Sequence, residues 1–366
     1  MIIGVPKEIK NQESRVGLLP SAAYQLVKKG HTVLVETAAG AGAGYADAEY
    51  ERAGARLCAD RRQVFAEADL IVKVKEPQPD EYPLLRRDQI LFTYLHLAAN
   101  RDLTTALLES GVTGIAYETI SVNRHLPLLE PMSEIAGRMS AIVGAYYLGR
   151  PRGGSGMLVS GVPGVLPAKV LVIGGGTAGV NAARMATGMG ADVTILEVDV
   201  ERMHFLDISL HTAHTLYSSE QALLDQLPRV DLLIGAVLVP GAKAPKLITR
   251  DMLRQMRPGS VFVDIAIDQG GCSETSRATT HDDPVYVEED VNHYCVANMP
   301  AAYCRTATQA LTNVTFKYIE TIATHGLSGA LELHPELSGG LNTQGGRLTC
   351  EAVATAHGIP HEPAQA

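Results

Sequence analysis

The chain has 366 residues, a hydrophobic composition of 46% and a formal net charge of −9. This length predicts about two domains, and the hydrophobic content is sufficient for globular cores. The acidic balance argues against nucleic acid as a partner, and the chain lacks the run of about 18 apolar residues that a bilayer span requires.

The first residues and the cysteines favour a cytoplasmic protein. The start, MIIGVPKEIK, lacks the basic and apolar regions of a secretory signal. The five cysteines are odd in number and have no C-x-x-C spacing, so we expect neither a disulfide framework nor a zinc site. Among the twelve histidines, the nearest pair, His211 and His214, is typical of a solvated loop or helix surface. We therefore expect no bound metal.

The first 120 or so residues alternate apolar runs with helical patterns, which predicts a parallel α/β sheet. We expect strands at residues 2–5, 32–36, 70–74, 90–95 and 114–117. Helices are expected between them, among others at 21–29 and 101–110. This half of the chain is therefore expected to form a nucleotide-fold-like domain without a glycine motif.

Polar residues follow three of these strands. Arg15 comes after the first strand, Lys75 ends IVKVK, and His96 ends ILFTYLH. Ligands of open parallel sheets bind outside the carboxyl ends of the strands, and burying a charge there without a partner is costly. We therefore expect the three side chains in one crevice. Alternatively, His96 is a hydrogen-bonded structural residue and the two cations form surface ion pairs. Their partners would then be Glu8, Glu13 or Glu76.

The stretch 169–199, KVLVIGGGTAGVNAARMATGMGADVTILEVD, contains the elements of a dinucleotide site in order. An apolar run at 170–173 predicts a buried strand, after which Gly174, Gly176 and Gly179 form G-x-G-x-x-G at the start of an Ala-rich helical segment. The first glycine permits a tight turn, the second lets the backbone approach a pyrophosphate, and the third lets the helix pack on the strand. Since the helix N-terminus then faces the phosphates, the stretch predicts a bound nicotinamide or flavin nucleotide.

The acid that follows favours NAD over NADP. A second strand, 193–196, is followed by Glu197, 23 positions after Gly174 (197 minus 174). A carboxylate in this place accepts hydrogen bonds from the adenosine ribose and repels a 2′-phosphate. Arg202 could approach a 2′-phosphate, but it could also lie over the adenine or pair with Glu197.

The rest of the chain continues the dinucleotide domain. We expect strands at 216–218, 231–236, 261–264 and 294–297, then a helix at 306–323 and a frayed tail, HEPAQA. Asp268 follows VFVDIAI, at the place where the nicotinamide would lie, although it could equally be a loop cap. The Gly- and Pro-rich stretches 150–156 and 162–167 predict loops.

The chain resembles alanine dehydrogenases, together with the NAD-binding subunit of proton-translocating transhydrogenases, nearly from end to end. The shared motifs are IGVPKEIKNQESRVGLLP, LIVKVKEP, ILFTYLHLAAN, YETI, PLLEPMSEIAGRM, VIGGGTAGVNAARMA, GAVLVPGAKAPKL, VDIAIDQGG and CVANMPA. The resemblance implies two doubly wound, Rossmann-like α/β domains in a hexameric enzyme. The NAD domain, 129–301, would be inserted into a substrate domain made of 1–128 and 302–366. The implied reaction is the reversible, NAD-dependent conversion of L-alanine and water to pyruvate and ammonium.

The resemblance also implies roles for the candidate residues. Arg15 would hold the substrate carboxylate, Lys75 would bind a carboxylate or carbonyl oxygen, and Asn298 would belong to the substrate site. His96 would be the general acid or base, because imidazole exchanges protons near neutrality, and Asp268 would orient or deprotonate the amine. The cofactor cleft would be lined by Ser133, Gly174, Gly176, Thr177, Ala178, Gly179, Glu197, Arg202, Ser218, Val237, Leu238, Ile265, Ala266, Ile267, Asp268, Val296, Asn298 and Met299.

Two alternatives to the deaminating enzyme stay open. The transhydrogenase subunit carries a characteristic Arg-Gln-Asp loop, which this sequence lacks. A non-catalytic, NAD-responsive binding protein would keep the cofactor cleft and use its first domain for a protein partner, but no extended apolar patch or charged tail indicates such a partner.

One position departs from the pattern of alanine dehydrogenases. Cys304 stands in AYCRTAT where that family typically has a proline before the basic residue. Because proline fixes the backbone angle φ, its replacement is expected to loosen the loop after the nicotinamide.

Overall fold

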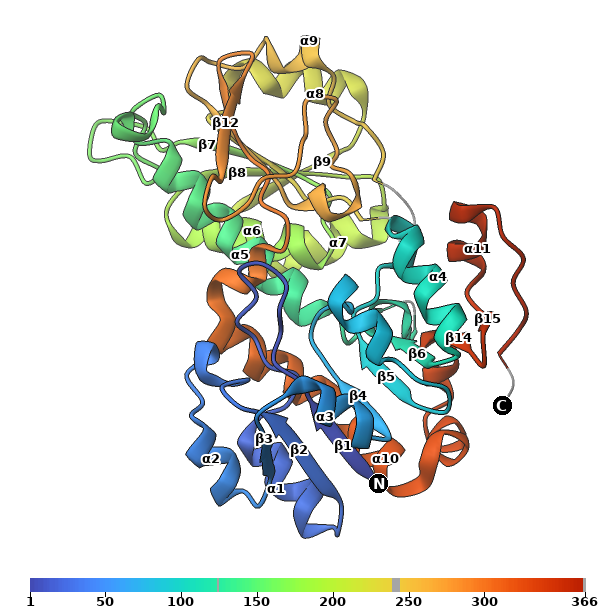
Figure 1. Cartoon of the computed structure of the whole chain (residues 1–366). Helices are drawn as coiled ribbons and strands as arrows, with labels where there is room; N and C mark the ends of the chain where they lie inside the picture. Colours follow the sequence, from blue (N-terminus) through green and yellow to red (C-terminus); the bar gives the residue numbers. More distant parts are fainter. Residues whose placement is uncertain (124, 239–243, 365–366) are drawn as a thin grey trace. The chain divides into compact units, whose positions relative to one another are not determined.

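The computed structural model describes residues 1–123, 125–238 and 244–364. The chain packs as two units (Figure 1). Unit 1 comprises Met1–Met132 and Ala301–Ala366, and unit 2 comprises Ser133–Pro300. Each unit is built on one predominantly parallel sheet covered by helices, so the expected α/β fold class with two doubly wound domains is confirmed.

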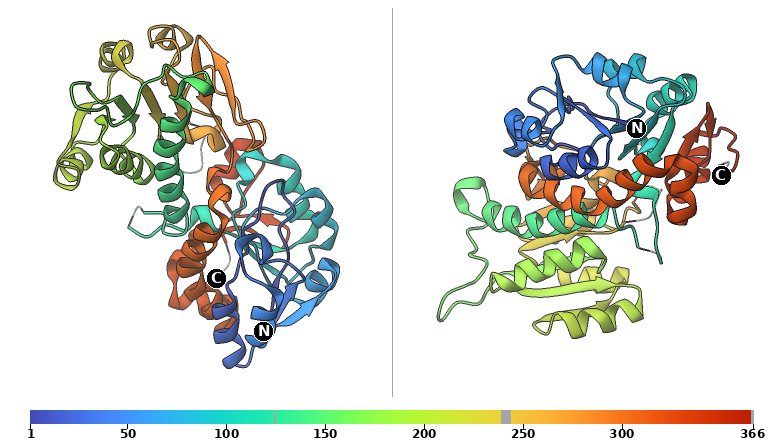
Figure 2. Two further views of the ribbon diagram at one scale, coloured as in Figure 1. Left: turned by 90° about the vertical axis from the view of Figure 1, so that its left-hand side faces the viewer. Right: turned by 90° about the horizontal axis from the view of Figure 1, so that it is seen from below.

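Unit 1 contains an eight-stranded sheet in the order β15-β14-β6-β5-β4-β1-β2-β3. Strands β1 to β6 pair in parallel, whereas β14 is antiparallel to β6 and β15 to β14. Figures 1 and 2 show the red C-terminal strands beside the cyan β6. The strand order reverses between β4 and β1, which makes their carboxyl ends a switch point where such sheets bind ligands. The strands are β1 (Ile2–Val5), β2 (Thr32–Glu36), β3 (Arg56–Cys58), β4 (Leu70–Val72), β5 (Ile90–Thr93), β6 (Thr113–Ala116), β14 (Leu341–Gln344) and β15 (Arg347–Leu348).

The helices of unit 1 have clear start and stop signals. Helix α4 begins where the Asn100 side chain accepts the N–H of Leu103 at 3.0 Å, and it ends at Gly111 in the left-handed conformation. Helix α10 is two helices joined at Gly326, whose φ of 71° and ψ of 179° are not helical. The expected helix 306–323 lies in the first of the two. The helices are α1 (Pro20–Lys28), α2 (Asp47–Arg52), α3 (Arg61–Glu67), α4 (Arg101–Ser110), α10 (Cys304–Leu333) and α11 (Glu351–His357).

Unit 2 contains a seven-stranded sheet in the order β12-β13-β11-β10-β7-β8-β9. All its neighbours pair in parallel except β12, which is antiparallel to β13, and the order reverses between β10 and β7. Its strands are β7 (Lys169–Ile173), β8 (Asp192–Glu197), β9 (Ala213–Tyr217), β10 (Leu232–Gly235), β11 (Val261–Asp264), β12 (Val285–Glu288) and β13 (Val291–Tyr294). Its helices are α5 (Glu130–Tyr147), which begins in unit 1, α6 (Thr177–Gly188), α7 (Val200–Ser209), α8 (Glu220–Gln226) and α9 (Arg250–Leu253).

Short 3₁₀ helices connect these elements. They are η1 (Ala41–Ala43), η2 (Pro79–Leu84), η3 (Leu97–Ala99), η4 (Tyr117–Thr119), η5 (Arg150–Arg152), η6 (Leu227–Arg229), η7 (Ile265–Gln269), η8 (Met299–Tyr303) and η9 (Pro335–Gly340). None of the helices in the described residues is both long and apolar enough to cross a bilayer.

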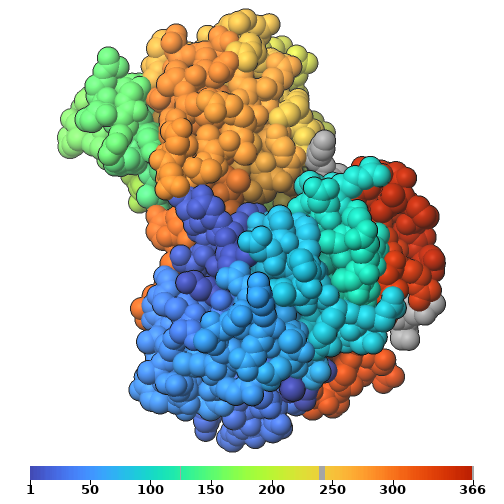
Figure 3. Space-filling view, viewed as in Figure 1, coloured from blue at the N-terminus to red at the C-terminus, as the bar shows by residue number. Residues whose placement is uncertain are grey.

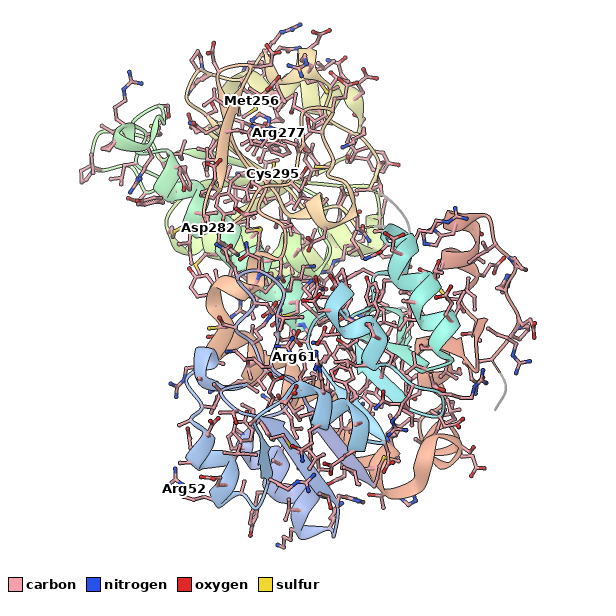
Figure 4. The ribbon with its side chains drawn as sticks, in the orientation of Figure 1. Arg52, Arg61, Met256, Arg277, Asp282 and Cys295 are labelled. Carbon is pink, nitrogen blue, oxygen red and sulfur yellow. The ribbon has the colours of Figure 1, made fainter. Side chains whose placement is uncertain are left out.

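The central strands of both sheets are buried on their two faces, as is typical of parallel strands. The central strands β4, β5, β10 and β11 consist of buried residues throughout. Figure 4 labels two further core residues of unit 2, Met256 and Cys295, and the exposed Arg52 on α2 of unit 1. This burial explains why the strands read as continuous apolar runs in the sequence.

Strands β4 and β5 each end two residues earlier than expected, for the same physical reason. Strand β4 stops at Val72 and not at residue 74, because the N–H groups of Val74 and Lys75 donate to the Glu8 carboxylate at 2.6 and 3.2 Å. Strand β5 stops at Thr93 and not at residue 95, because the N–H groups of Leu95 and His96 donate to Glu118. A carboxylate thus takes the donors that a longer strand would use.

The expectation for strand 294–297 is wrong, and three antiparallel strands were not expected. Strand β13 ends at Tyr294 because it pairs with β11 and with β12 along Val291–Tyr294, while Val296 makes only an isolated bridge with Thr279. The hairpin of β14 and β15 turns at Gly345 and Gly346, which both have positive φ.

A buried ion triad stabilises the centre of unit 1. Lys73 follows β4, its side chain is completely buried, and its Nζ lies 2.9 Å from Glu8 Oε2 and 3.0 Å from Glu81 Oε1. Burial raises the pKa of Glu8 above its ordinary value, although the positive charge of Lys73 acts in the opposite direction. In this triad, one buried ammonium group therefore binds two carboxylates.

We predict that Lys73→Met lowers the free energy of unfolding by about 3–5 kcal/mol, because two buried carboxylates lose their cation. The pKa of Glu8 should rise further in the variant. Since a raised folded-state pKa contributes stability at low pH that is lost as pH rises through it, the deficit should be larger at pH 8 than at pH 5. Urea unfolding at both pH values, followed by circular dichroism, measures the loss.

Lys29→Met is the matched control, because Lys29 pairs with Glu320 at the surface. We expect that variant to change the free energy of unfolding by less than about 1 kcal/mol. A Lys73→Met deficit that is equally small, or that does not change with pH, would contradict the assignment of the triad.

Candidate active site

The sequence-predicted site residues form two groups, one at the carboxyl edge of each sheet. Arg15, Lys75 and His96 follow β1, β4 and β5 in unit 1, and these strands are neighbours in the sheet. The candidate cofactor residues lie in unit 2. Most of them follow β7, β8, β9, β10, β11 and β13. The rule that ligands bind at the carboxyl ends of parallel strands therefore accounts for both groups.

Arg15 is a buried residue with a buried partner. It is 1% exposed, its Nε lies 2.7 Å from Glu13 Oε1, and its Nη2 is bound by Glu13 Oε2. Its Nη1 lies 3.0 Å from Met132 Sδ. Glu13 is thus the ion-pair partner that the sequence allowed, but the pair is in the interior and not at the surface. One edge of the guanidinium thus faces this carboxylate, and Nη1 faces the thioether of Met132.

Lys75 is buried near acidic residues. It is 6% exposed, and its backbone N–H donates to Glu8 Oε1. The neighbouring Glu76 binds Lys10 Nζ at 2.5 Å through Oε1, while its buried Oε2 has no hydrogen-bond partner among the described residues. Burial alone would raise the pKa of Glu76, but the charges of Lys75 and Lys10 together lower it below its ordinary value. Lys75 is therefore part of a network that keeps Glu76 anionic.

His96 has an uncommon backbone conformation. Its φ of 48° and ψ of 39° are left-handed, which few residues other than glycine adopt. Its N–H donates to Glu118 Oε1 at 2.6 Å, and its Nδ1 lies 3.9 Å from the same oxygen. The ring stacks on Tyr94 with centroids 5.8 Å apart, and the side chain is 39% exposed. His96 can therefore exchange protons with a ligand or with solvent.

The glycine motif of unit 2 has the geometry that a pyrophosphate site needs. Gly174 has a φ of 93°, and a Cβ at Gly179 would lie 1.8 Å from the carbonyl oxygen of Gly174. Gly176, at the N-cap of α6, is exposed and has open space where a Cβ would stand. Thr177 and Ala178 form the first turn of this helix. The backbone can thus approach a phosphate at the helix N-terminus.

Helix α5 packs against this same turn. A Cβ at Gly137 would lie 2.2 Å from the Ala178 carbonyl oxygen, and Arg138 Nε binds Asn181 Oδ1 at 3.0 Å. Ser133 lies four residues before Gly137 and therefore on the same face of α5. The structure thus brings Ser133 to the side of α5 that meets the first turn of α6.

The acid at the end of β8 contacts the glycine loop directly. Glu197 is half-buried, and its Oε2 accepts the N–H of Gly175 at 2.7 Å. Arg202 Nε donates to the carbonyl oxygen of Gly175 at 2.6 Å, and its guanidinium lies 4.5 Å from the ring centroid of Phe205. Ser218 follows β9 and donates its N–H to the Glu197 carbonyl oxygen at 2.8 Å. Glu197 and Arg202 thus contact the same glycine, and Ser218 binds the backbone of Glu197.

The remaining candidates follow β10, β11 and β13. Val237 and Leu238 come directly after β10, and the exposed Asp268 lies in η7. Asp268 Oδ1 accepts the N–H of Asn298 at 3.1 Å, which ties the two loops together. The side chains of several other candidates are at most partly exposed, so that these residues can meet a ligand chiefly through their backbone. They are Ile265, Ala266, Ile267, Val296 and Met299.

A buried carboxylate supports the loop that carries Asp268. Asp264 accepts the N–H of Ala266 at 3.0 Å and the N–H of Cys272 at 2.9 Å, and burial raises its pKa above the ordinary value. In the same unit, Arg277 lies over the Tyr286 ring, 3.8 Å from its centroid; Figure 4 labels Arg277 and Asp282. The loop is therefore held at its base by polar contacts inside the unit.

Sequence reasoning missed Glu118 and the burial of Glu8 and Glu13, three carboxylates that support the unit 1 group. Glu8 and Glu13 were considered only as surface partners, and Glu118 was not considered. A signal existed for Glu118, because it follows β6 just as His96 follows the neighbouring β5. Cys304, the residue that departs from the alanine dehydrogenase pattern, begins α10 and donates its Sγ–H to the Gly42 carbonyl oxygen at 3.2 Å.

The unit 2 group fits a dinucleotide. The open backbone at Gly176 and the close helix packing at Gly179 suit a pyrophosphate. The carboxylate of Glu197 suits the hydroxyl groups of a ribose. Among the described residues, no group of three or more His, Cys, Asp or Glu side chains could hold a metal ion. The chemistry available at the two groups is thus carboxylate binding, proton exchange and dinucleotide binding.

Comparisons with known proteins cover nearly the whole chain. The family profiles described as "Alanine dehydrogenase/PNT, N-terminal domain" and "Alanine dehydrogenase/PNT, C-terminal domain" match residues 4–136 and 140–351. The chain is 55% identical to the alanine dehydrogenase of Halomonas elongata, covering 99% of this chain and 98% of that one. It is 54% identical to the alanine dehydrogenase of Bacillus subtilis, covering 100% and 97%.

Solved structures of related proteins also match nearly the whole chain. A structure titled L-alanine dehydrogenase superposes with a TM-score of 0.93 at 51% identity, over 98% of this chain and 99% of that one. A transhydrogenase from Sinorhizobium meliloti superposes with a TM-score of 0.82 at 27% identity, over 95% and 100%.

We predict that Gly179→Ala weakens NADH binding by at least about tenfold, since the new methyl group would push α6 away from the turn at Gly174. NADH fluorescence titration measures this change. Gly188→Ala is the control in the same helix, because a Cβ there meets no atom within 4 Å. Equal NADH affinities of the two variants would show that the tight turn does not shape the binding site.

Proposed function

The chain belongs to the alanine dehydrogenase/PNT family, and on this premise we propose that it catalyses the reversible, NAD-dependent oxidative deamination of L-alanine to pyruvate and ammonium. One observation carries the proposal: two buried cations and a proton-exchanging histidine follow three adjacent strands of unit 1, in a chain whose second unit has a dinucleotide loop. We assign substrate binding to unit 1 and cofactor binding to unit 2.

The two cations would hold the substrate anion. Arg15 would bind the carboxylate with a guanidinium that Glu13 holds in a fixed orientation. Lys75 would bind a carboxylate or 2-oxo oxygen as a point charge and draw electron density from C2. Since both side chains are buried, water screens their attraction for the anion only weakly.

Proton transfer would fall to His96 and Asp268. NAD, when bound, supplies the nicotinamide that accepts the hydride from Cα. His96 would take a proton from the water that adds to the resulting iminium and return one to the departing ammonia. Asp268 would orient the amine, with Asn298 held beside it through the backbone N–H that Asp268 accepts. The products are pyruvate, ammonium, NADH and a proton.

The decisive experiment is an NADH oxidation assay with pyruvate and ammonium together. We expect rapid oxidation with both, and none above background with pyruvate alone. Glyoxylate and larger 2-oxo acids, tested with ammonium, report the substrate range. Oxidation that does not need ammonium would instead indicate a 2-hydroxy acid dehydrogenase, and the absence of oxidation would favour a binding protein. Transhydrogenation has less support, because the transhydrogenase is the more distant relative.

Glu197 is expected to select NAD over NADP. Its carboxylate would accept hydrogen bonds from the adenosine ribose and repel a 2′-phosphate. We predict that Glu197→Ser raises the kcat/KM ratio of NADPH to NADH by at least about tenfold, which corresponds to about 1.4 kcal/mol. Initial rates with each cofactor at saturating pyruvate and ammonium give the ratio.

The ratio is the proper measure, because the variant also removes the acceptor of the Gly175 N–H and so lowers the rate with NADH itself. Glu201→Gln controls for a general loss of negative charge, since Glu201 is exposed one turn away on α7. A ratio that changes equally in the control, or not at all in Glu197→Ser, would show that Glu197 does not face the ribose.

We further propose that the protein is a homohexamer, the state that the family resemblance implies. An apolar arm supports self-association: its side chains Leu158, Val162, Val165 and Leu166 are 54–80% exposed. Figures 1 and 3 show this green segment extending beyond the end of α5. Exposed apolar groups gathered in one segment are typical of a surface that a partner covers.

We predict that Leu166→Asp reduces the mass of the assembly in light scattering, because a charge would have to be buried in the contact. Leu333→Asp is the matched control, an exposed leucine outside the arm. A full-sized assembly in the Leu166→Asp variant would exclude the arm from the subunit contact.

A further inference from the structure

Glu118 and His96 lie on adjacent strands of unit 1, each just beyond its strand end. Strand β5 ends at Thr93, strand β6 ends at Ala116, and the two pair in parallel along Ile90–Thr93. Glu118 lies in η4, which follows β6 without an intervening residue. Because parallel strands end at the same edge, the carboxylate reaches across to the chain that leaves β5.

The Glu118 carboxylate binds the backbone where it turns into the left-handed conformation. Its Oε1 accepts the N–H of His96 at 2.6 Å, and both of its oxygens lie 3.2 Å from the N–H of Leu95. The side chain of Glu118 is 13% exposed, so that water competes weakly for these two donors. A left-handed residue other than glycine persists only where its surroundings hold it, and here the carboxylate does so.

The same carboxylate also faces the imidazole. His96 Nδ1 lies 3.9 Å from Glu118 Oε1, and the ring stacks on Tyr94, whose hydroxyl donates to the Leu128 carbonyl oxygen. The opposite ring nitrogen, Nε2, is therefore directed away from Glu118. One side chain thus binds the backbone of His96 and lies on the Nδ1 side of its ring.

We propose that Glu118 is a positioning residue for His96: it holds the left-handed backbone that presents Nε2 for proton transfer. This inference rests on the proposed function, in which His96 moves protons to and from the substrate. General acid–base catalysis requires the proton-transfer atom within hydrogen-bond reach of its target, so loss of the carboxylate should lower turnover without changing the cofactor affinity.

The test compares Glu118→Ala with Glu118→Gln, which keeps an oxygen acceptor for the backbone N–H. We expect Glu118→Ala to lower kcat for reductive amination of pyruvate by at least about tenfold, with the KM for NADH within about twofold of wild type. Glu118→Gln should recover most of the loss. Glu109→Ala, at an exposed glutamate on α4, controls for the loss of an acid elsewhere in unit 1.

A double-mutant cycle separates positioning from general support of the fold. In a His96→Ala background, Glu118→Ala should lower the remaining kcat by less than about twofold, because its effect in the wild type acts through the imidazole. The same fold-loss in both backgrounds, or no loss in the single variant, would overturn the proposal.

Amide hydrogen exchange provides a readout that does not depend on the reaction. Mass spectrometry of the peptide containing Leu95 and His96 should show faster exchange in Glu118→Ala than in wild type and Glu118→Gln. Unchanged exchange would overturn the proposal even in an active enzyme. Faster exchange in a protein that does not aminate pyruvate would instead leave the contact established and place the failure in the proposed function.

Discussion

Carboxylates that bind backbone N–H groups at the ends of strands determine the architecture of both sheet edges. Glu8 takes the donors after β4, Glu118 those after β5, Glu197 the N–H of Gly175 after β7, and Asp264 those of the loop after β11. Where a parallel strand stops, its next N–H groups need another acceptor, and an anionic oxygen is a strong one. The candidate residues occupy the turns that these carboxylates hold in place.

This arrangement also shapes the electrostatics of unit 1. The buried acids Glu8, Glu13 and Glu81 form ion pairs with the buried cations Arg15 and Lys73. Lys75 adds a further positive charge at the same edge, and the cations face their acids on one side. An anionic substrate would therefore meet cations that are already oriented by fixed partners, which reduces the reorganisation needed on binding.

Much of this could be predicted from the sequence, because it depends on local patterns. Apolar runs predicted the central parallel strands, and the glycine spacing predicted the turn before α6. The position of Arg15, Lys75 and His96 after strands predicted that they lie at one edge of the sheet. Strand ends could not be predicted, because β4 stops where the N–H groups after it donate to Glu8, which lies more than 60 positions earlier in the chain. The short strands β12, β14 and β15 lack a long alternating pattern. The pairing of Arg15 with Glu13 was foreseen as an alternative, but its burial required the tertiary structure.

The antiparallel pairing of β14 with β6 means that unit 1 cannot complete its sheet until the C-terminal part of the chain has been synthesised. Unit 1 needs residues from both ends of the chain, because Leu341 and Thr343 complete its sheet beside Ile115 and Gly114. Unit 2 is one uninterrupted segment that leaves the ribosome earlier. Since domains fold as units once their residues are available, the inserted nucleotide unit can reach its native state first. The edge of β6 then stays unpaired until β14 emerges, and an unpaired strand edge can pair with another chain.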